Sequence, residues 1–387
     1  MINFPYILDK KEVQAGGSSS ATTAVNGAVE FSGPISVIVN AAVTNLAEYG
    51  YDDDWNWIKK IYSPIKGKTL NTLSFEENSE FWEVGDDEIS ETTIGTLDFR
   101  NCTSNDIYLG PKALMYSTID HLLLRDDQAF SFYGTLELSC PYITNEVLYT
   151  MLTHSNAVPA LVYIDDANIQ GFYAENAPNV DCSANCRITH LVIPANITEF
   201  GSGRIITNSP YDVVFEPRED DVSFGEIGYT FSHGATSIDL AENITSLVFD
   251  FANGNTSLTS IIFPSTITNL GSDSFLGCTN LSNITFRNAD SSDSREAISF
   301  ESGLFNDCCP TSIILPNNLA EAPTTFGTSI ESITFLSTSN SGINSFIDYI
   351  DNETALDHTC NVYTKADVTQ EYIDKAAAKN YIVTKIS

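Results

Sequence analysis

After about residue 69 the chain repeats one short pattern, in which two apolar residues flank a single variable position. A period of two predicts a strand that buries one face, and most of the repeats start 20 to 30 residues apart. Units of this length cannot bury their apolar face alone, so they stack on their neighbours into a solenoid. The pattern predicts a ladder of strands with cores at Leu73–Phe75, Leu97–Phe99, Leu122–Leu124, Leu136–Leu138, Leu161–Tyr163, Leu191–Ile193, Val213–Phe215, Leu247–Phe249, Ile261–Phe263, Ile284–Phe286, Ile313–Leu315 and Ile333–Phe335.

Two intervals in this series are too short for a complete turn. They run from Leu122 to Leu136 and from Leu247 to Ile261, and each spans 14 residues. At least one strand near each interval is therefore either misassigned or outside the ladder.

The clearest unit runs from Leu258 to Asn280 and is followed by the next strand core at Ile284–Phe286. Pro264 is expected to end the first strand because proline lacks a backbone donor, and Gly271 is expected to permit the turn. The positions expected in the core are Leu258, Ile261, Phe263, Ile267, Leu270, Phe275 and Cys278.

This unit resembles the BspA-like leucine-rich repeats of bacterial surface antigens, which are also seen in phage proteins. The resemblance is best over 258–286 and returns at Thr311–Pro316 and Thr189–Pro194. It implies a leucine-rich repeat solenoid, with a parallel β ladder and an irregular or short helical convex side, and it implies surface recognition. The segments 141–190 and 216–246 depart from the pattern, and we expect loops there.

The chain is expected to have four parts. Residues 1–28 are rich in Gly, Ser, Ala and Thr and predict a flexible or partner-ordered arm. Residues 29–68 predict a small β-containing N-terminal module or cap, since the β-branched Ile35, Val37 and Val39 recur with period two and predict a strand pair or hairpin around Gly33-Pro34. The solenoid is expected over 69–360. The remainder, 361–387, resembles a strand-plus-helix C-terminal cap.

Charge excludes some partners. The 387 residues include 18 basic and 51 acidic side chains, a formal charge of −33. Nucleic-acid binding needs clustered Lys and Arg, and an anionic membrane surface repels such a chain. No stretch approaches the roughly 20 apolar residues that cross a bilayer, so we expect neither nucleic-acid binding nor membrane insertion. The apolar start, Met1–Leu8, is cut short by charged residues, and we expect no signal peptide.

Eight cysteines in a chain of this length are too sparse for a disulfide scaffold and predict small buried thiols. Cys182, Cys186 and His190 have a spacing near that of metal ligands, but zinc usually takes four ligands and no fourth is near. A disulfide between the two cysteines, or two free buried thiols, is the favoured interpretation. The pair Cys308-Cys309 stands at the position in its repeat that Cys278 takes in the clearest unit. This correspondence favours packing in the core.

Acidic runs at Asp52–Asp54 and Glu219–Asp221 offer oxygen ligands for calcium, but neither has the spacing of a calcium loop. Solvated acidic loops are the favoured interpretation. The sequence has no nucleophile elbow, phosphate-binding loop, dinucleotide fingerprint or zinc-protease motif. We therefore predict no catalytic residues, no metal and no cofactor, and a protein that is not an enzyme.

The outward positions of the strands form a continuous surface, and repeat proteins use such surfaces to bind partners. These positions are small, polar and mixed in sign, which fits a protein-binding or carbohydrate-binding face and equally an ordinary hydrated sheet. The candidate binding residues are Asp98, Arg100, Asp120, His121, Arg125, Asn283, Thr285, Arg287 and Thr334.

The leading hypothesis is a non-enzymatic structural and adhesive protein, a surface component of a phage virion anchored by its N-terminus. An unprocessed start, a flexible arm with a small β module and a distal solenoid motivate it. Residues 1–68 would contact other virion or surface proteins, and the solenoid a cell-surface protein or glycan. The alternative is a bacterial cell-surface or secreted adhesin that binds host protein or glycan. A cytosolic scaffold is a third hypothesis.

Overall fold

The structure is a computed structural model that divides into two compact units, Met1–Ile188 and Thr189–Ser387. It describes residues 24–25, 28–29, 35–39, 47–51, 57–61 and 162–165, and the longer stretches 67–154 and 189–387. Within those stretches the description omits 86–87, 90, 111–112, 115, 133–135, 140–142, 198–209, 225–230, 232, 248 and 292–294. Most of the expected arm, the turn at Gly33-Pro34, the run Asp52–Asp54 and the pair Cys182 and Cys186 lie outside the described residues.

The first unit is built mainly of short strands. Its elements are β1 (Ala24–Val25), β2 (Ala28–Val29), β3 (Ile35–Val39), β4 (Ala47–Tyr51), β5 (Trp57–Ile61), β6 (Thr69–Phe75), β7 (Glu83–Val84), β8 (Thr93–Asp98), β9 (Asp106–Leu109), β10 (Thr118–Leu123), β11 (Ala129–Phe132), β12 (Leu136–Ser139), α1 (Asn145–Thr153) and β13 (Val162–Asp165).

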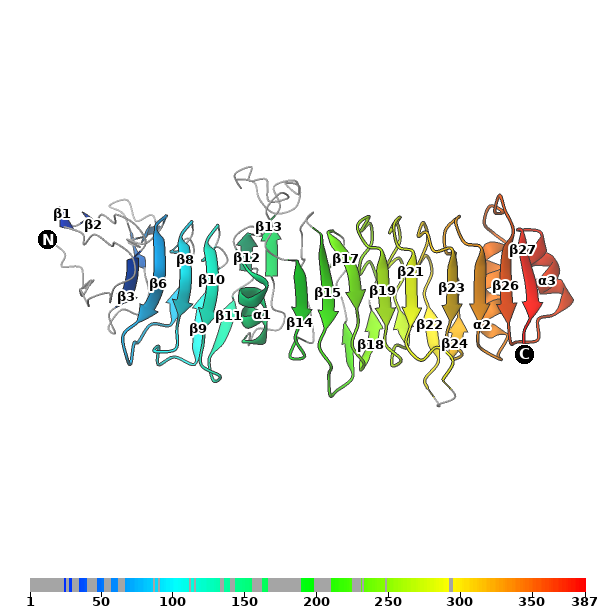
Figure 1. Cartoon of the computed structure of the whole chain (residues 1–387), viewed down its shortest axis with the longest axis horizontal. Coiled ribbons are helices and arrows are strands. Elements are labelled where there is room, and N and C mark those ends of the chain that lie inside the picture. Colours follow the sequence, from blue (N-terminus) through cyan, green and yellow to red (C-terminus); the bar gives the residue numbers. More distant parts are fainter. Residues whose placement is uncertain are drawn as a thin grey trace. The chain divides into compact units, whose positions relative to one another are not determined.

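Two parallel sheets share the core of this unit (Figure 1). Sheet 1 has the order β3-β6-β8-β10 and sheet 2 the order β7-β9-β11, and all their strands run parallel. The sheets meet through aromatic rings: Phe75 of β6 packs on Phe81, with centroids 4.4 Å apart, and Phe99 packs on Phe130 of β11 at 6.0 Å. The pairs β1-β2 and β4-β5 are antiparallel, and β12-β13 is parallel.

The strand predicted at Ile35–Val39 is present, with Val37 and Val39 buried. Among the described residues it pairs in parallel with β6, with Val37 opposite Leu73, and not with a strand before Gly33-Pro34 as the expected hairpin requires. The region 29–68 therefore contributes the first strand of sheet 1 and shares its sheet with the repeats that follow.

The second unit contains β14 (His190–Ile193), β15 (Tyr211–Phe215), β16 (Val222–Phe224), β17 (Ala235–Asp239), β18 (Ile244–Leu247), β19 (Ser260–Phe263), β20 (Asn269–Leu270), β21 (Asn283–Phe286), β22 (Ile298–Phe300), β23 (Ser312–Leu315), β24 (Leu319–Glu321), β25 (Ser332–Phe335), α2 (Ser341–Ile350), β26 (Cys360–Thr364), α3 (Gln370–Ala377) and β27 (Tyr381–Lys385).

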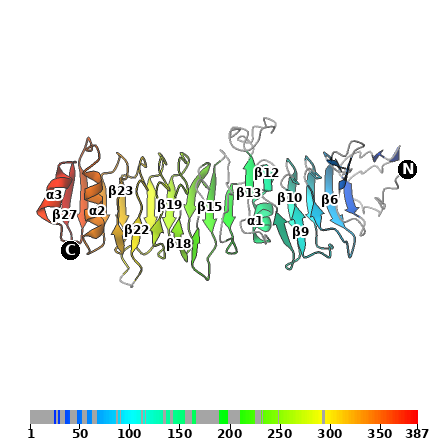
Figure 2. The same ribbon diagram turned by 180° about the vertical axis from the view of Figure 1, so that it is seen from behind.

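This unit is a parallel leucine-rich repeat solenoid, seen from its two sides in Figure 1 and Figure 2. Sheet 3 has the order β14-β15-β17-β19-β21, sheet 4 the order β16-β18-β20-β22-β24, and sheet 5 the order β23-β25-β26-β27. From β15 to β22 the chain alternates between sheet 3 and sheet 4 from one strand to the next, so each of these repeats supplies one strand to each sheet. After β24, helices α2 and α3 take the place of strands between the members of sheet 5.

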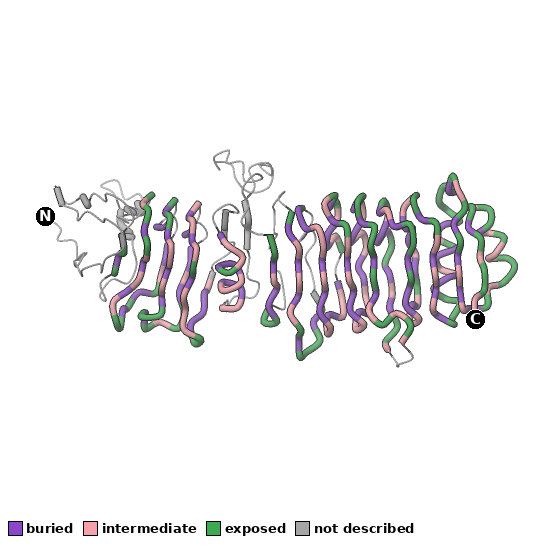
Figure 3. The backbone as a smooth tube through the Cα atoms, viewed as in Figure 1, coloured by how far each residue is buried: buried purple, intermediate pink, exposed green. Residues whose placement is uncertain are grey.

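The buried positions are those that the repeat pattern predicted. The seven expected core residues between Leu258 and Cys278 are all at most 2 % exposed. Figure 3 shows the alternation of buried and more exposed positions along the strands. In the turns that follow the strands of sheet 4, and then in α2, the rings of Phe251, Phe275, Phe305, Phe326 and Phe346 stack with neighbouring centroids 5.6–6.1 Å apart. Inward aromatic and aliphatic columns therefore hold the repeats together.

Both short intervals have a structural explanation. Leu247 belongs to β18 of sheet 4, where it pairs with Leu270, and Phe249 is 53 % exposed. The ladder strand of that repeat is β17, whose Ile238 pairs with Ile261. The prediction of Leu247–Phe249 as a strand of the same ladder as Ile261–Phe263 was wrong, because strands of both sheets carry the same alternation.

The other short interval and the two expected loop regions also contain regular elements. Leu136 lies in β12, which pairs with β13, while Ile143 forms the parallel bridge to Ile119 of sheet 1.

The two segments expected to be loops contain regular elements. The segment 141–190 includes helix α1, which begins after Thr144. The Thr144 hydroxyl accepts a hydrogen bond from the Val147 amide at 3.1 Å and so caps the helix. The segment 216–246 contains β16 and β17, so the expectation of a loop there was wrong.

Candidate functional site

The candidate residues of the first unit lie on the outer side of sheet 1 and in the turns that leave it. Thr72, Thr96 and His121 are in register on β6, β8 and β10. His121 is exposed and its Nδ1 lies 3.2 Å from Oε1 of Glu146 in α1. Asp120 is half-buried, and its carbonyl accepts a 3.4 Å hydrogen bond from the Thr144 hydroxyl. Polar groups of β10, the edge strand of sheet 1, therefore contact helix α1 and its N-cap residue.

Asp98 and Arg100 form an ion pair within one turn. Arg100 Nε donates to Asp98 Oδ1 at 2.9 Å, and Nη2 donates to Oδ2 at 2.8 Å. Partial burial works to raise the pKa of Asp98, but the hydrogen bonds from Arg100 outweigh it and hold the pKa below its usual value. Arg100 remains half-exposed, so this pair presents a fixed charge pattern to solvent.

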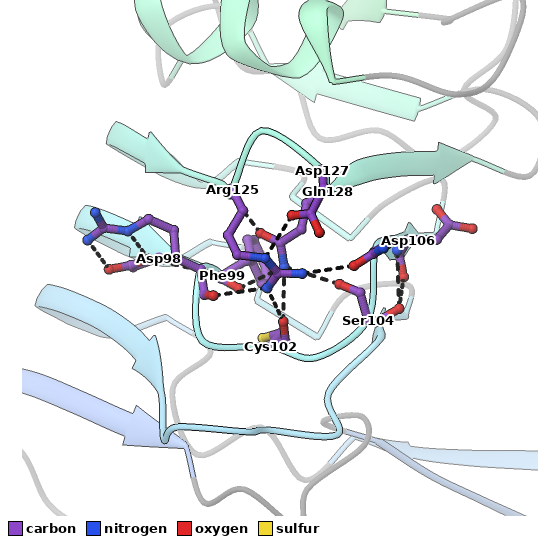
Figure 4. Close-up of polar contacts among 10 residues, drawn as sticks. Asp98, Phe99, Cys102, Ser104, Asp106, Arg125, Asp127 and Gln128 are labelled. Atoms are coloured by element: carbon purple, nitrogen blue, oxygen red, sulfur yellow. Dashed lines mark hydrogen bonds and ion pairs between the residues drawn. The ribbon is translucent and has the colours of Figure 1, made fainter.

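Arg125 is directed into the neighbouring turn (Figure 4). Its Nη1 donates to the carbonyl of Arg100 at 3.0 Å and also to that of Cys102, and its Nη2 donates to Asn105 Oδ1 at 2.9 Å. Its Nε donates to Asp127 Oδ1 at 2.8 Å. The guanidinium donors are thus used to join two turns of the first unit.

In the second unit Asn283 and Thr285 are exposed on β21. Register places Asn283 beside Ser260, and Thr285 beside Ile262. Three of these four outward side chains are polar, and the polar groups of Asn283 and Thr285 are accessible to solvent.

Arg287 spans two repeats on the outer side of sheet 3. It donates to the Asp239 carboxylate and to the Leu240 carbonyl, and its Nη1 lies 3.9 Å from Glu242 Oε1. Asp239 is in register with Ile262, which lies between it and Thr285. The ion pair therefore lies next to the exposed residues of β21. Because Arg287 is engaged with Asp239, less of its positive charge is available to a partner.

Thr334 lies on sheet 5 and is half-buried. It is in register with Ile314, which is 55 % exposed, and with Tyr363, which is half-buried. A second outward column next to it contains Ser312, Ser332 and Asn361. The outer face of sheet 5 therefore includes Ser312, Ile314, Ser332, Thr334, Asn361 and Tyr363, and it continues on β27 with the exposed Ile382 and Thr384, in register with Asn361 and Tyr363.

Sequence reasoning missed the apolar members of this face. Ile314 is the middle residue of the predicted core Ile313–Leu315, and alternation alone assigns it outward. Tyr363 lies two strands further along the ladder, in β26 (Cys360–Thr364). Aligning the middle positions of successive strands would have found both, because the register of a parallel ladder places them side by side.

The sites considered for metals have simple environments where they are described. No three or more His, Cys, Asp or Glu side chains group as possible ligands in the described part of the chain. His190 is exposed and pairs with Asp212 of the neighbouring strand, and Glu219–Asp221 are exposed. The absence of a metal and of a cofactor stays a prediction.

The described cysteines are free thiols, and all but the half-buried Cys309 lie in the core. Burial raises the pKa of Cys102, Cys278 and Cys360 to about 12. The Cys278 thiol donates to the Ala252 carbonyl at 3.1 Å, and that of Cys308 donates to the Phe275 carbonyl at 3.3 Å. These groups stay protonated and serve packing, as the sequence predicted.

Residues 242–359 match the BspA type leucine rich repeat region, in six copies. This segment consists of BspA-type leucine-rich repeats. The BspA-type repeats thus extend beyond the best predicted stretch, 258–286, in both directions. The expected resemblance at Thr189–Pro194 lies outside the matched residues. No helix of the described residues is long and apolar enough to span a bilayer.

The chain is also similar to one solved structure, the crystal structure of the pneumococcal vaccine antigen PcpA. The two sequences are 12% identical, and the match covers 92% of this chain and 89% of PcpA, with a TM-score of 0.28. No curated protein matches the sequence.

Proposed function

We propose that this chain is a non-enzymatic bacterial surface or secreted adhesin, which binds a host protein or glycan through the outer faces of its sheets. The observation that carries the proposal is the register of sheets 3 and 5. It stacks small polar and exposed apolar side chains in parallel columns on BspA-type repeats. Extended faces of this kind are the binding surfaces of repeat proteins.

The outer face of sheet 5 has the composition of a contact surface. Ile314 supplies apolar area, Tyr363 supplies an aromatic ring with a polar tip, and Asn361 supplies an amide. Interfaces are enriched in aromatic side chains and depleted in charge at their centre. The parallel ladder holds these groups on rigid backbone, which lowers the ordering cost of binding. A protein or a glycan surface fits such a face.

The repeats support a surface-binding role better than a virion role. BspA-type repeats cover residues 242–359, and no comparison favours a phage particle. Contacts through residues 1–68 with other surface proteins remain a prediction of the same proposal. Localisation at the bacterial cell surface or outside the cell belongs to it as well.

Two experiments test the proposal. Antibodies against the chain should label intact bacterial cells or their medium and should not label purified phage particles. Wild-type protein should also bind at least one component of a panel of immobilised host proteins and glycans. Thr285→Arg and Ile314→Arg, which place a long cation on the outer faces of sheets 3 and 5, should weaken that binding by about tenfold or more.

Ser223→Arg is the matched control, since Ser223 is exposed on sheet 4 and receives the same side chain away from the proposed face. Equal loss of binding in all three variants would point to a general charge effect. If the antibodies label phage particles and neither cells nor their medium, the virion hypothesis is favoured instead.

A further inference from the structure

Trp82 is exposed on the first unit, immediately before β7. It is 45 % exposed, whereas the preceding Phe81 is fully buried. The Phe81 ring packs 4.4 Å from that of Phe75 and 6.2 Å from that of Phe99, between sheets 1 and 2. Because Phe81 is fixed in the core, the backbone leaves Trp82 outside it. Tryptophan is well buried on average, and exposed tryptophans are a frequent anchor of protein interfaces.

The outer face of sheet 2 begins at Glu83, the residue directly after Trp82. Glu83 of β7 is in register with Tyr108 of β9, and Tyr108 is in register with Ser131 of β11. Asp106 lies two residues before Tyr108, on the same side of β9, and its carboxylate accepts from the Ser131 hydroxyl at 2.5 Å. The Tyr108 amide donates to the Trp82 carbonyl at 2.8 Å. The backbone beside the indole and the Asp106 carboxylate are therefore held in place.

Charge in this part of the chain is strongly unbalanced. Residues 67–154 contain fifteen Asp and Glu and four Lys and Arg. Arg100 is paired with Asp98, and Arg125 with Asp127 and the carbonyls of the preceding turn. A surface with such a surplus attracts cations and repels anions, and it speeds the encounter with a basic partner. Charge complementarity therefore favours a cationic partner for this part of the chain.

We propose that the outer face of sheet 2 binds a Lys- or Arg-rich segment of a protein partner, with one cationic side chain over the Trp82 indole. Tryptophan is the strongest ring for a cation–π contact. Carboxylates such as Glu83 and Asp106 make charge-assisted hydrogen bonds to neighbouring guanidinium or ammonium groups. The inference rests on the proposed binding function and adds to it a second surface, in the other unit, and the charge class of its partner.

The probe is a fluorescently labelled peptide of about ten arginines, titrated with the full chain at about 0.15 M salt, where distant surface charges are screened. Wild-type protein should bind it, and Trp82→Ala should weaken binding by about tenfold, as expected for an interface anchor. Trp82→Tyr should retain most of the affinity because it keeps an aromatic face. Phe249→Ala is the matched control, since Phe249 is an exposed aromatic of the second unit and should leave binding unchanged.

A separate pair of substitutions measures the contribution of the Glu83 and Asp106 carboxylates to peptide binding. The double variant with Glu83→Gln and Asp106→Asn keeps the size of both side chains and removes their charge. It should weaken binding and flatten its dependence on salt. An equal loss on replacing two exposed carboxylates of the second unit, Glu301→Gln and Glu321→Gln, would show general attraction to an acidic protein and overturn the proposal.

Three other outcomes also overturn it: no binding of the peptide by wild-type protein, equal affinity of Trp82→Ala and wild type, or binding of the neutral sugar maltohexaose that is lost in Trp82→Ala. The last would assign the face to glycans. Failure of this inference is distinguishable from failure of the proposed function. Suppose that one of these outcomes is found, and that binding to the host panel is weakened by Thr285→Arg but not by Trp82→Ala. Only the sheet 2 surface is then ruled out, and the proposed function stands.

Discussion

Phe263 and Phe286 occupy the same inward position in successive strands of sheet 3, with ring centroids 4.9 Å apart and ring planes inclined by 21°. The distance matches the spacing of neighbouring strands. Each ring therefore covers the ring of the repeat before it, and a residue in one repeat stabilises the next. This coupling is what makes a stack of short units stable when a single unit is not.

Phe263→Ala should reduce the free energy of unfolding by about 3–5 kcal/mol, because it leaves a cavity in a packed core. The ring is fully buried and also packs against Phe275 and Phe305, at 5.7 and 6.3 Å. Urea unfolding followed by circular dichroism measures the change. Phe249→Ala removes the same atoms from an exposed position and should change stability by about 0.5 kcal/mol or less. Similar losses in the two variants would contradict the assigned register.

The sequence predicted the inward columns because they depend only on alternation, which is a local property. It could not separate the strands of sheet 3 from those of sheet 4, since Ile238 and Leu247 follow the same rule and differ only in the partner they pair with. It also could not show that Arg125 turns toward the carbonyls of the preceding turn. That contact depends on how two turns stack, which no spacing along the chain records.

Arg125→Met should lower the free energy of unfolding by about 1–3 kcal/mol, as expected when carbonyl acceptors lose a charged donor. Methionine keeps much of the apolar stem, so the guanidinium contacts are the main loss. Arg100→Met is the control, because Arg100 is 53 % exposed and pairs within its own turn. An exposed ion pair contributes at most about 1 kcal/mol. If thermal unfolding ranks the two variants in the opposite order, Arg125 does not join the turns as described.

Gly327→Ala should be more destabilising than Gly254→Ala. Both glycines have a positive φ, +74° and +76°, which costs an alanine about 1–2 kcal/mol. An added Cβ at Gly254 meets nothing within 4 Å, whereas at Gly327 it would lie 1.7 Å from the Cys308 carbonyl oxygen. Both variants place an alanine at a positive φ and share that cost. The difference between their free energies of unfolding in urea therefore measures the cost of the clash alone. Equal losses would mean that the turn at Gly327 relaxes without disturbing its neighbour.

His358 should make stability depend on pH. Its Nδ1 lies 2.8 Å from Asp357 Oδ1 and its Nε2 lies 2.9 Å from the Ile330 carbonyl oxygen, so the protonated ring donates from both nitrogens. The hydrogen bond to Asp357, followed by that to Ile330, raises the pKa of His358 above its usual value of 6.5, and the Glu331 carboxylate acts in the same direction.

A raised pKa in the folded state means that the stabilising contribution is complete below the unfolded value and is lost as the pH rises through the folded value. The melting temperature of wild type should therefore exceed that of His358→Gln most clearly below about pH 6, and the difference should shrink as the pH rises beyond about 6.5. Glutamine retains one donor but does not titrate, so its own curve supplies the baseline. A difference that stays constant across this range would show that His358 contributes only a neutral hydrogen bond to the loop before β26.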